Sequence, residues 1–413
     1  MKQAMESFNS FISEQKNTHM THIEDKVLYG GVDGTRAAIN ALRSLRDLLQ
    51  GKHKGDISVK WDGAPAIFVG TDPRDGEFFV AKKSIFNKNP KVYKTPADID
   101  DDTSGDLNRK LKLALELLPS LNIKGVIQGD FLFGPGDVKT TNIDGQRYVS
   151  FHPNTIVYAM DPKSEAAKQV KRAKIGIVWH TTYTGRSFET MRASYGVNVA
   201  GLTNSTSVWS QDAMLRDVTT ATLTDAQTKQ VNEYLSTAGS LFRKVAGSTL
   251  RTLQGNPELA GMIEQFNNTY VRKGTVVRDS RRHAIALQRW IKSKYAKEIA
   301  KRKTERGKAA QQQKLATIMS FFSAKNTQSL IAMFELQKNL VLAKLILINK
   351  LNSLARLDTF VKTTKGYKVT GQEGFVAIDK LGGDAVKLVD RMEFSYNNFS
   401  PDVLKGWDQP SRK

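Results

Sequence analysis

Residues 59–65, which read Val-Lys-Trp-Asp-Gly-Ala-Pro, decide how the rest of the chain is interpreted. The residues before them predict a short strand, so Lys60 stands at a strand end, with Asp62 and Gly63 two and three positions further on. A lysine amine attacks phosphorus only without its proton, and the pKa of free lysine is about 10.4. Partial burial and neighbouring positive charge lower that pKa, which makes Lys60 a candidate nucleophile. Such a tetrapeptide also arises by chance at surface turns, so its meaning depends on its surroundings.

The residues around this stretch predict a helix followed by a strand-rich region. Apolar residues recur at helical spacing over residues 35–50. Residues 72–76, Asp-Pro-Arg-Asp-Gly, predict a hairpin turn, and residues 106–118 predict a helix. Strands are expected at 57–60, 65–70, 77–83, 124–133, 147–151, 154–160 and 174–182.

The composition changes after residue 200. Residues 210–360 are nearly free of proline, rich in Ala, Leu, Gln, Lys and Arg, and helical in their periodicity. Strand character returns at 366–378 and 385–394, with Gly382-Gly383 as the turn between them. We therefore expect four segments: a helical segment, 1–54, packed on a catalytic domain, the first part of that domain, 55–200, a basic α-helical insertion, 201–365, and the completing strands, 366–413.

The charge of the chain favours a polyanionic partner. The formal net charge is +21 over 413 residues, and proteins that neutralise phosphates release condensed counterions. Residues 271–308 contain 14 Lys and Arg residues and only three acidic ones. The candidate contacts to nucleic acid in this segment are Arg278, Arg281, Arg282, Arg289 and Lys292. The alternative is a solvated helical face with no partner.

Several classes of site are excluded or disfavoured. The chain has no cysteine, which rules out disulfides, thiolate metal sites and cysteine nucleophiles. No apolar run reaches the roughly 18 residues of a membrane span, and the first residues lack the apolar core of a signal peptide, so we expect a cytoplasmic protein. His19, His22 and Glu24 have a spacing that can hold a metal, but no scaffold is evident around them. Residues 30–35 are glycine-rich but lack the lysine of a phosphate-binding loop.

Six segments resemble, in order, the motifs of the covalent nucleotidyltransferases. The lysine, aspartate and glycine of residues 60–63 resemble motif I (KxDG). The other segments are 81–85 (Ala-Lys-Lys-Ser-Ile, motif Ia), 126–133 (Val-Ile-Gln-Gly-Asp-Phe-Leu-Phe, motif III), 174–180 (Lys-Ile-Gly-Ile-Val-Trp-His, motif IIIa), 373–376 (Glu-Gly-Phe-Val, motif IV) and 385–391 (Ala-Val-Lys-Leu-Val-Asp-Arg, motif V). The helical insertion between motifs IIIa and IV has no counterpart in the family pattern.

The resemblance implies a role for each matching residue. Lys60 is the nucleophile, and Asp62 maintains the geometry of the site. Glu373 and Asp130 bind a divalent metal or the ribose, and Lys387 and Lys83 bind phosphates. Val59 and Gly63 flank the nucleotide. Asp130 stands where the family usually has glutamate, and motif V has one lysine where two are usual, with Arg391 as a conceivable substitute.

The resemblance also implies an aromatic residue that stacks on the purine. Trp179 is the first candidate, and Tyr158 on the preceding strand is its rival. For each of them the alternative is a buried aromatic of the hydrophobic core.

The implied fold is α+β: a nucleotidyltransferase domain (an ATP-grasp-like ligase adenylation domain) of antiparallel sheets with helices, interrupted by the helical insertion. Only 22 residues follow Arg391, which leaves no room for the OB-fold domain of DNA ligases and capping enzymes. The pattern is similar to phage-type RNA ligases, which implies ATP and Mg²⁺ (or Mn²⁺), an RNA substrate with DNA possible, a monomer, and the host cytoplasm. The alternatives are a DNA nick ligase and a non-catalytic nucleic-acid-binding or virion protein.

Overall fold

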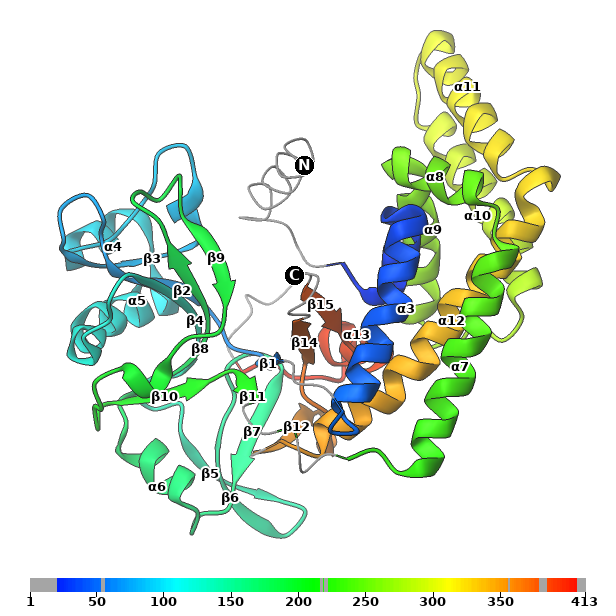
Figure 1. Ribbon diagram of the computed structural model, residues 1–413. Helices are drawn as coiled ribbons and strands as arrows, with labels where there is room; N and C mark the ends of the chain where they lie inside the picture. The colour runs from blue at the N-terminus through cyan, green and yellow to red at the C-terminus, as the bar shows by residue number, and fades with distance from the viewer. Residues whose placement is uncertain are drawn as a thin grey trace.

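The computed structural model describes residues 21–52, 56–215, 218, 222–355, 357–378 and 385–406. Figure 1 shows strands gathered on one side of the molecule and long helices on the other, with the C-terminal strands between them. Helices and mostly antiparallel sheets both contribute extensively, which confirms the α+β class. No helix in these ranges is long and apolar enough to cross a membrane.

The first described segment is helical. It consists of η1 (Ile23–Asp25), α2 (Lys26–Tyr29) and α3 (Gly31–Leu48), and α3 confirms the helix expected over 35–50. Its apolar stripe, which includes Leu42 and Leu45, is buried. This stripe packs against α7, α8 and α12 of the helical region described below. The expectation that this segment packs on the strand-rich domain is therefore wrong in its main contacts.

The largest sheet has six strands: β2 (Ala66–Thr71), β3 (Phe78–Ala81), β4 (Val126–Phe133), β8 (Ile175–Thr184), β9 (Arg192–Tyr195) and β10 (Val208–Asp212). Their order is β10-β8-β4-β2-β3, with β9 paired to β8, and only β10 runs parallel to its neighbour. The apolar residues on one face of the sheet pack against α5 (Gly105–Leu117), which follows α4 (Pro96–Asp102). A capping box at Thr95 begins α4.

A second sheet has five antiparallel strands: β5 (Lys139–Ile143), β6 (Gln146–Phe151), β7 (Ile156–Met160), β12 (Asp358–Thr363) and β13 (Gly366–Val369). Their order is β13-β12-β7-β6-β5, so strands from both halves of the chain pair through β12 and β7. The helix α6 (Glu165–Arg172) connects β7 to β8.

The third sheet joins distant parts of the chain. Its four strands, β11 (Met214–Leu215), β1 (Asp56–Lys60), β14 (Gly374–Ile378) and β15 (Ala385–Leu388), lie in that order. The helix α13 (Arg391–Phe399) follows β15, so the strand expected over 385–394 is wrong beyond Leu388. Asp390 stops the strand because its side chain caps the first turn of α13. The expected Gly382-Gly383 turn lies outside the described residues.

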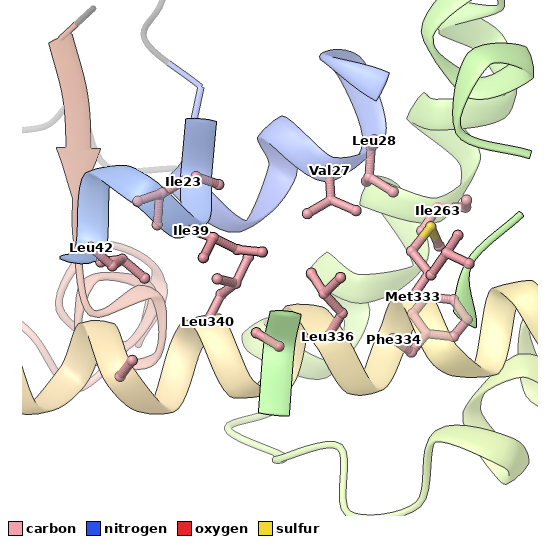
Figure 2. Packing of buried hydrophobic residues seen from close by; sticks show 14 of the residues in the cluster. Ile23, Val27, Leu28, Ile39, Leu42, Ile263, Met333, Phe334, Leu336 and Leu340 are labelled. Atoms are coloured by element: carbon pink, nitrogen blue, oxygen red, sulfur yellow. The ribbon is translucent and has the colours of Figure 1, made fainter. Parts of the chain in front are cut away.

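The helical region comprises α7 (Asp225–Lys244), α8 (Gly247–Gly255), α9 (Pro257–Arg272), α10 (Ser280–Ala300), α11 (Glu305–Phe321) and α12 (Ala324–Asn352). It is shorter than the expected 201–365, because β10, β11 and β12 belong to the sheets. Figure 2 shows Met333, Leu336 and Leu340 of α12 facing the apolar residues of the N-terminal segment. The same core includes Ile57 and Phe375 of the third sheet, so this sheet and the helices share one core.

Candidate functional site

The candidate site centres on Lys60 at the end of β1. In the antiparallel pair of β1 and β14, Lys60 lies opposite Gly374, which brings Glu373 beside it. The Lys60 amine and the Glu373 carboxylate form an ion pair, in which the lysine side chain is 36% exposed and the glutamate 10%. Burial raises the pKa of Glu373 to about 7, and the charges of Asp62 and Asp130 act in the same direction against that of Lys60. The amine is thus accessible while its partner is enclosed.

Lys387 brings a second cation to this site. It lies opposite Val376 in the pair of β14 and β15, and its amine stands 5.9 Å from the centre of the Phe394 ring. Burial lowers the pKa of Lys387, and the nearby charge of Lys60 lowers it further. A bridge between His22 and Lys387 ties the N-terminal segment to the edge of β15.

Asp62 is a structural anchor within the site. Its buried carboxylate accepts hydrogen bonds from Thr155 N (2.6 Å), Ile156 N (2.8 Å) and Asn154 Nδ2 (2.8 Å). Its own N–H donates to the Tyr158 hydroxyl at 2.7 Å. Burial raises the pKa of Asp62, while these hydrogen bonds oppose the rise. Asp62 therefore fixes the loop after Lys60 against the start of β7.

Gly63 allows this loop to contact β4. A Cβ atom at Gly63 would lie 2.6 Å from Cβ of Asp130, so a larger residue would displace the loop. Asp130 lies opposite Ala66 in the pair of β2 and β4, and its charge reaches Glu373. Val59 lies on β1 with its side chain packed against the shared core, and its N–H donates to Ala213 O at 2.8 Å. Val59 therefore supports the strand that carries Lys60, and its side chain is part of the core.

Neither expected stacking residue presents a free ring. Trp179 is completely buried in the core beside α5, and its Nε1 donates to Ser210 Oγ at 3.2 Å. Tyr158 is also completely buried, and the Trp61 ring stacks on it with 4.8 Å between centroids. A base could reach either ring only if the core opened, so the stacking role expected for Trp179 is wrong and the core interpretation holds for both.

Two further basic residues were candidates for phosphate contacts. Lys83 is exposed in η2 (Lys83–Phe86), after the edge strand β3. Arg391 is bound by Asp25 (2.8 Å), by Glu24 (3.5 Å) and by Asn268, so its guanidinium is already engaged and does not replace the second lysine of motif V.

The early histidines form no evident metal site in the described residues. His22 is half-buried, and this burial lowers its pKa to about 3, while His19 lies outside the described residues. No group of three or more potential ligands is present in the described ranges. The charge of Asp130 acts on Glu373, so these are the two carboxylates that could hold a divalent ion together with substrate phosphates.

The predicted nucleic-acid contacts are exposed just before α10 and along its first half and middle. All five of them, Arg278, Arg281, Arg282, Arg289 and Lys292, have accessible side chains. In Figure 1, α10 lies toward the outer edge of the helical region, while β1 and β14 lie near the middle of the molecule. The structure therefore places this basic surface apart from the Lys60 site.

The prediction from sequence missed His180, whose Nε2 lies 3.7 Å from Asp130 Oδ2. No local pattern indicated this contact, because His180 lies at an irregularity in the pairing of β4 and β8.

Together, the fold and the site define an α+β protein whose sheets gather lysines and carboxylates from distant segments. A protein-family model described as "Family of unknown function (DUF6267)" matches residues 17–402. This match spans most of the chain, so the protein belongs to that family. No curated protein and no solved structure matches the chain.

Proposed function

We propose that the protein is a covalent nucleotidyltransferase with the nucleotidyltransferase fold, and that it acts as an ATP-dependent RNA ligase. One observation carries this proposal: β1, β14 and β15 bring Lys60, Glu373 and Lys387 together from opposite ends of the chain. These are the residues that match motifs I, IV and V. A chance match of short motifs would have no reason to place them side by side.

The reaction proceeds in three displacements at phosphorus. The Lys60 amine attacks the α-phosphorus of ATP, a P–N bond forms, and pyrophosphate leaves with the electrons of the broken P–O bond. The adenylyl group then passes to a 5′-phosphate end, which releases the amine. A 3′-hydroxyl attacks the activated phosphate and expels AMP. Each step depends mainly on positioning and charge neutralisation.

The residues around Lys60 provide proton transfer and charge. Before a divalent ion binds, the Glu373 carboxylate, whose pKa burial raises to about 7, is a suitable acceptor for the proton that the amine gives up. Lys387 stands near Lys60 and supplies positive charge for the phosphates. A divalent ion at Glu373 and Asp130 would neutralise the phosphate charge during transfer. Asp62 holds the loop through its three hydrogen bonds.

The exposed basic residues of α10 support a nucleic-acid partner. Cationic side chains on one helix bind the phosphate backbone without reading its sequence. RNA is the preferred substrate class in this proposal, and the separation of α10 from Lys60 implies contact with a part of the strand remote from the reacting end.

The test is transfer of label from ATP to the protein. Wild-type protein with [α-³²P]ATP and Mg²⁺ should acquire an acid-labile label, and Lys60→Ala should acquire none. The matched control is Lys124→Ala, which removes an exposed lysine just before β4 and should label normally. Absence of label in the wild type, or label that persists in Lys60→Ala, contradicts the proposal and favours a non-catalytic binding protein. Ligation assays with RNA ends and with nicked DNA then separate an RNA ligase from a DNA nick ligase.

A further inference from the structure

An irregularity in the sheet directs His180 toward the candidate site. Along the pair of β4 and β8, Gln128 lies opposite Thr181 but Gly129 lies opposite Trp179, so His180 is the extra residue of a β-bulge. Bulges re-aim side chains and are frequent beside active sites. Val178 lies opposite Asp130, and paired residues share a face of the sheet. Since Trp179 points into the core, His180 projects on the face of Asp130.

The two side chains present unpartnered polar atoms to each other. His180 Nε2 and Asp130 Oδ2 are 3.7 Å apart, which is longer than a hydrogen bond, and the side chains are 27% and 21% exposed. Within the described ranges, neither His180 Nε2 nor the Asp130 carboxylate has a hydrogen-bond partner. The other ring nitrogen, Nδ1, lies 2.8 Å from Thr181 Oγ1. If Nδ1 donates its proton there, Nε2 faces Asp130 with a free lone pair.

This arrangement matches one side of a metal site. Histidine ligands usually have their second ring nitrogen fixed by a hydrogen bond, the position that Thr181 occupies here. Two ligands that each lie about 2.1 Å from one ion at tetrahedral or octahedral angles are about 3–3.5 Å apart. A small side-chain rotation brings Nε2 and Oδ2 to that spacing. In the part of the chain that the structure describes, no third acidic or histidine side chain joins this pair in a metal-binding group.

We propose that His180 and Asp130 bind a divalent first-row transition ion, such as Mn²⁺, in preference to Mg²⁺. The ligand type decides the preference, because imidazole nitrogen binds transition ions well, whereas Mg²⁺ takes oxygen ligands almost exclusively. Water and substrate phosphate complete the coordination. This inference rests on the proposed function for the role of the ion at Lys60, but binding itself requires no nucleotide.

Direct metal binding tests the inference. Electron paramagnetic resonance of free Mn²⁺, titrated from 10 μM to 10 mM against wild-type protein and competed with Mg²⁺, should give at least about tenfold tighter binding of Mn²⁺ than of Mg²⁺. His180→Gln should abolish that preference, while Asp130→Asn should weaken the binding of both ions. Thr181→Ala, which removes only the anchor of Nδ1, should weaken Mn²⁺ binding about tenfold. Thr182→Ala on the same strand is the control and should bind as the wild type does.

The outcomes separate this inference from the proposed function. No Mn²⁺ bound below 10 mM by the wild type, or equal Mn²⁺ affinity in His180→Gln and wild type at an unchanged thermal midpoint, overturns the metal site. Either result would overturn only the metal site, and the labelling of Lys60 by ATP would still test the proposed function. Conversely, Mn²⁺ binding that depends on His180 without any labelling of Lys60 keeps the metal site and rejects the transferase.

Discussion

Two of the protein's Lys–Glu ion pairs lie in very different surroundings. Lys60 and Glu373 pair between strands, with an accessible amine and a carboxyl whose pKa burial raises to about 7. Lys344 of α12 and Glu24 pair inside the helical core, where the side chains are 1% and 5% exposed and the Nζ–Oε distances are 2.9 Å.

The electrostatics of the two glutamates are opposite. Burial alone would raise the pKa of Glu24, but the charges of Lys344 and Arg391 overcome it and lower that pKa to about 2. For Glu373, burial disfavours the ionised form, and the charges of Asp62 and Asp130 add to this effect, so that the single cation paired with it, Lys60, does not overcome them. The comparison teaches that Lys344 and Arg391 compensate the buried charge of Glu24, whereas the single cation beside Glu373 leaves charge for a ligand to complete.

The largest difference should appear when each lysine is replaced by methionine. Lys344→Met leaves the Glu24 carboxylate buried without its main partner and should reduce the free energy of unfolding by about 3–5 kcal/mol. Lys60→Met removes an accessible amine and should change it by less than about 1 kcal/mol. Urea unfolding at pH 7 measures both. Equal losses in the two variants would show that both pairs are structural.

Two aspartates of the candidate site should likewise differ in how much their replacement lowers the free energy of unfolding. Asp62→Ala leaves the N–H groups of Thr155 and Ile156 buried without acceptors, and should cost about 2–4 kcal/mol. Asp130→Ala, at a carboxylate without a hydrogen bond in the described ranges, should cost less than about 1 kcal/mol. Chemical unfolding of both variants checks this. A large loss in Asp130→Ala would mean that Asp130 also has a structural role.

The raised pKa of Glu373 predicts a stability cost that depends on pH. The carboxyl has a pKa of about 7 in the folded protein and 4.5 as its ordinary value, so its contribution to stability is lost as pH rises from about 4.5 through 7. Lys60, Asp62 and Asp130 are the charged groups that face it. The free energy of unfolding of Glu373→Gln, relative to that of the wild type, should therefore increase by about 1–3 kcal/mol between pH 5 and pH 8.

Urea unfolding at the two pH values measures this gain. The control is Glu116→Gln on the exposed face of α5, for which the difference from wild type should stay constant with pH. A constant difference in Glu373→Gln as well would refute the charge imbalance described for the site.

The smallest effect is expected on the outer surface of the helices. Replacement of Arg281, Arg282 and Arg289 by alanine should weaken binding of an RNA oligonucleotide by about 3- to 10-fold and reduce the slope of log K against log salt by about 2–3. The control removes three exposed cations from α6, through Lys168→Ala, Lys171→Ala and Arg172→Ala, with the same change in net charge. An equal loss in both triple variants would indicate that net charge, and not the α10 surface, governs binding.

Much of the local structure could be predicted from sequence, because it depends on periodicity. Strand alternation before Lys60 and the apolar stripe over residues 35–50 identify β1 and α3. The end of β15 could also have been predicted from the sequence, because Asp390 followed three residues later by Glu393 is typical of the start of a helix. The apolar alternation of Val386 and Leu388 led instead to an overlong strand.

The site could be predicted only in part, because its assembly depends on long-range pairing. The order of the motifs led to Glu373 and Lys387, but no local pattern states that β14 lies beside β1. The faces of Trp179 and Tyr158 were ambiguous for a related reason. Tyr158 lies in a strand that is buried along its whole length, and Trp179 ends the run of five buried residues that begins β8. In such runs periodicity does not distinguish a core face from a ligand face. The bulge at His180 is a property of register, which exists only once β4 and β8 are paired.

The position of β1 in the third sheet has a consequence for protein synthesis. β1 leaves the ribosome early, but its neighbour β14 is translated only after all the helices of the 225–352 region. Until then one edge of β1 has unpaired backbone groups, which expose the nascent chain to wrong strand partners. A ribosome that stalls before codon 373 therefore leaves a chain that keeps Lys60 and most of the helical core but contains no partner for the amine.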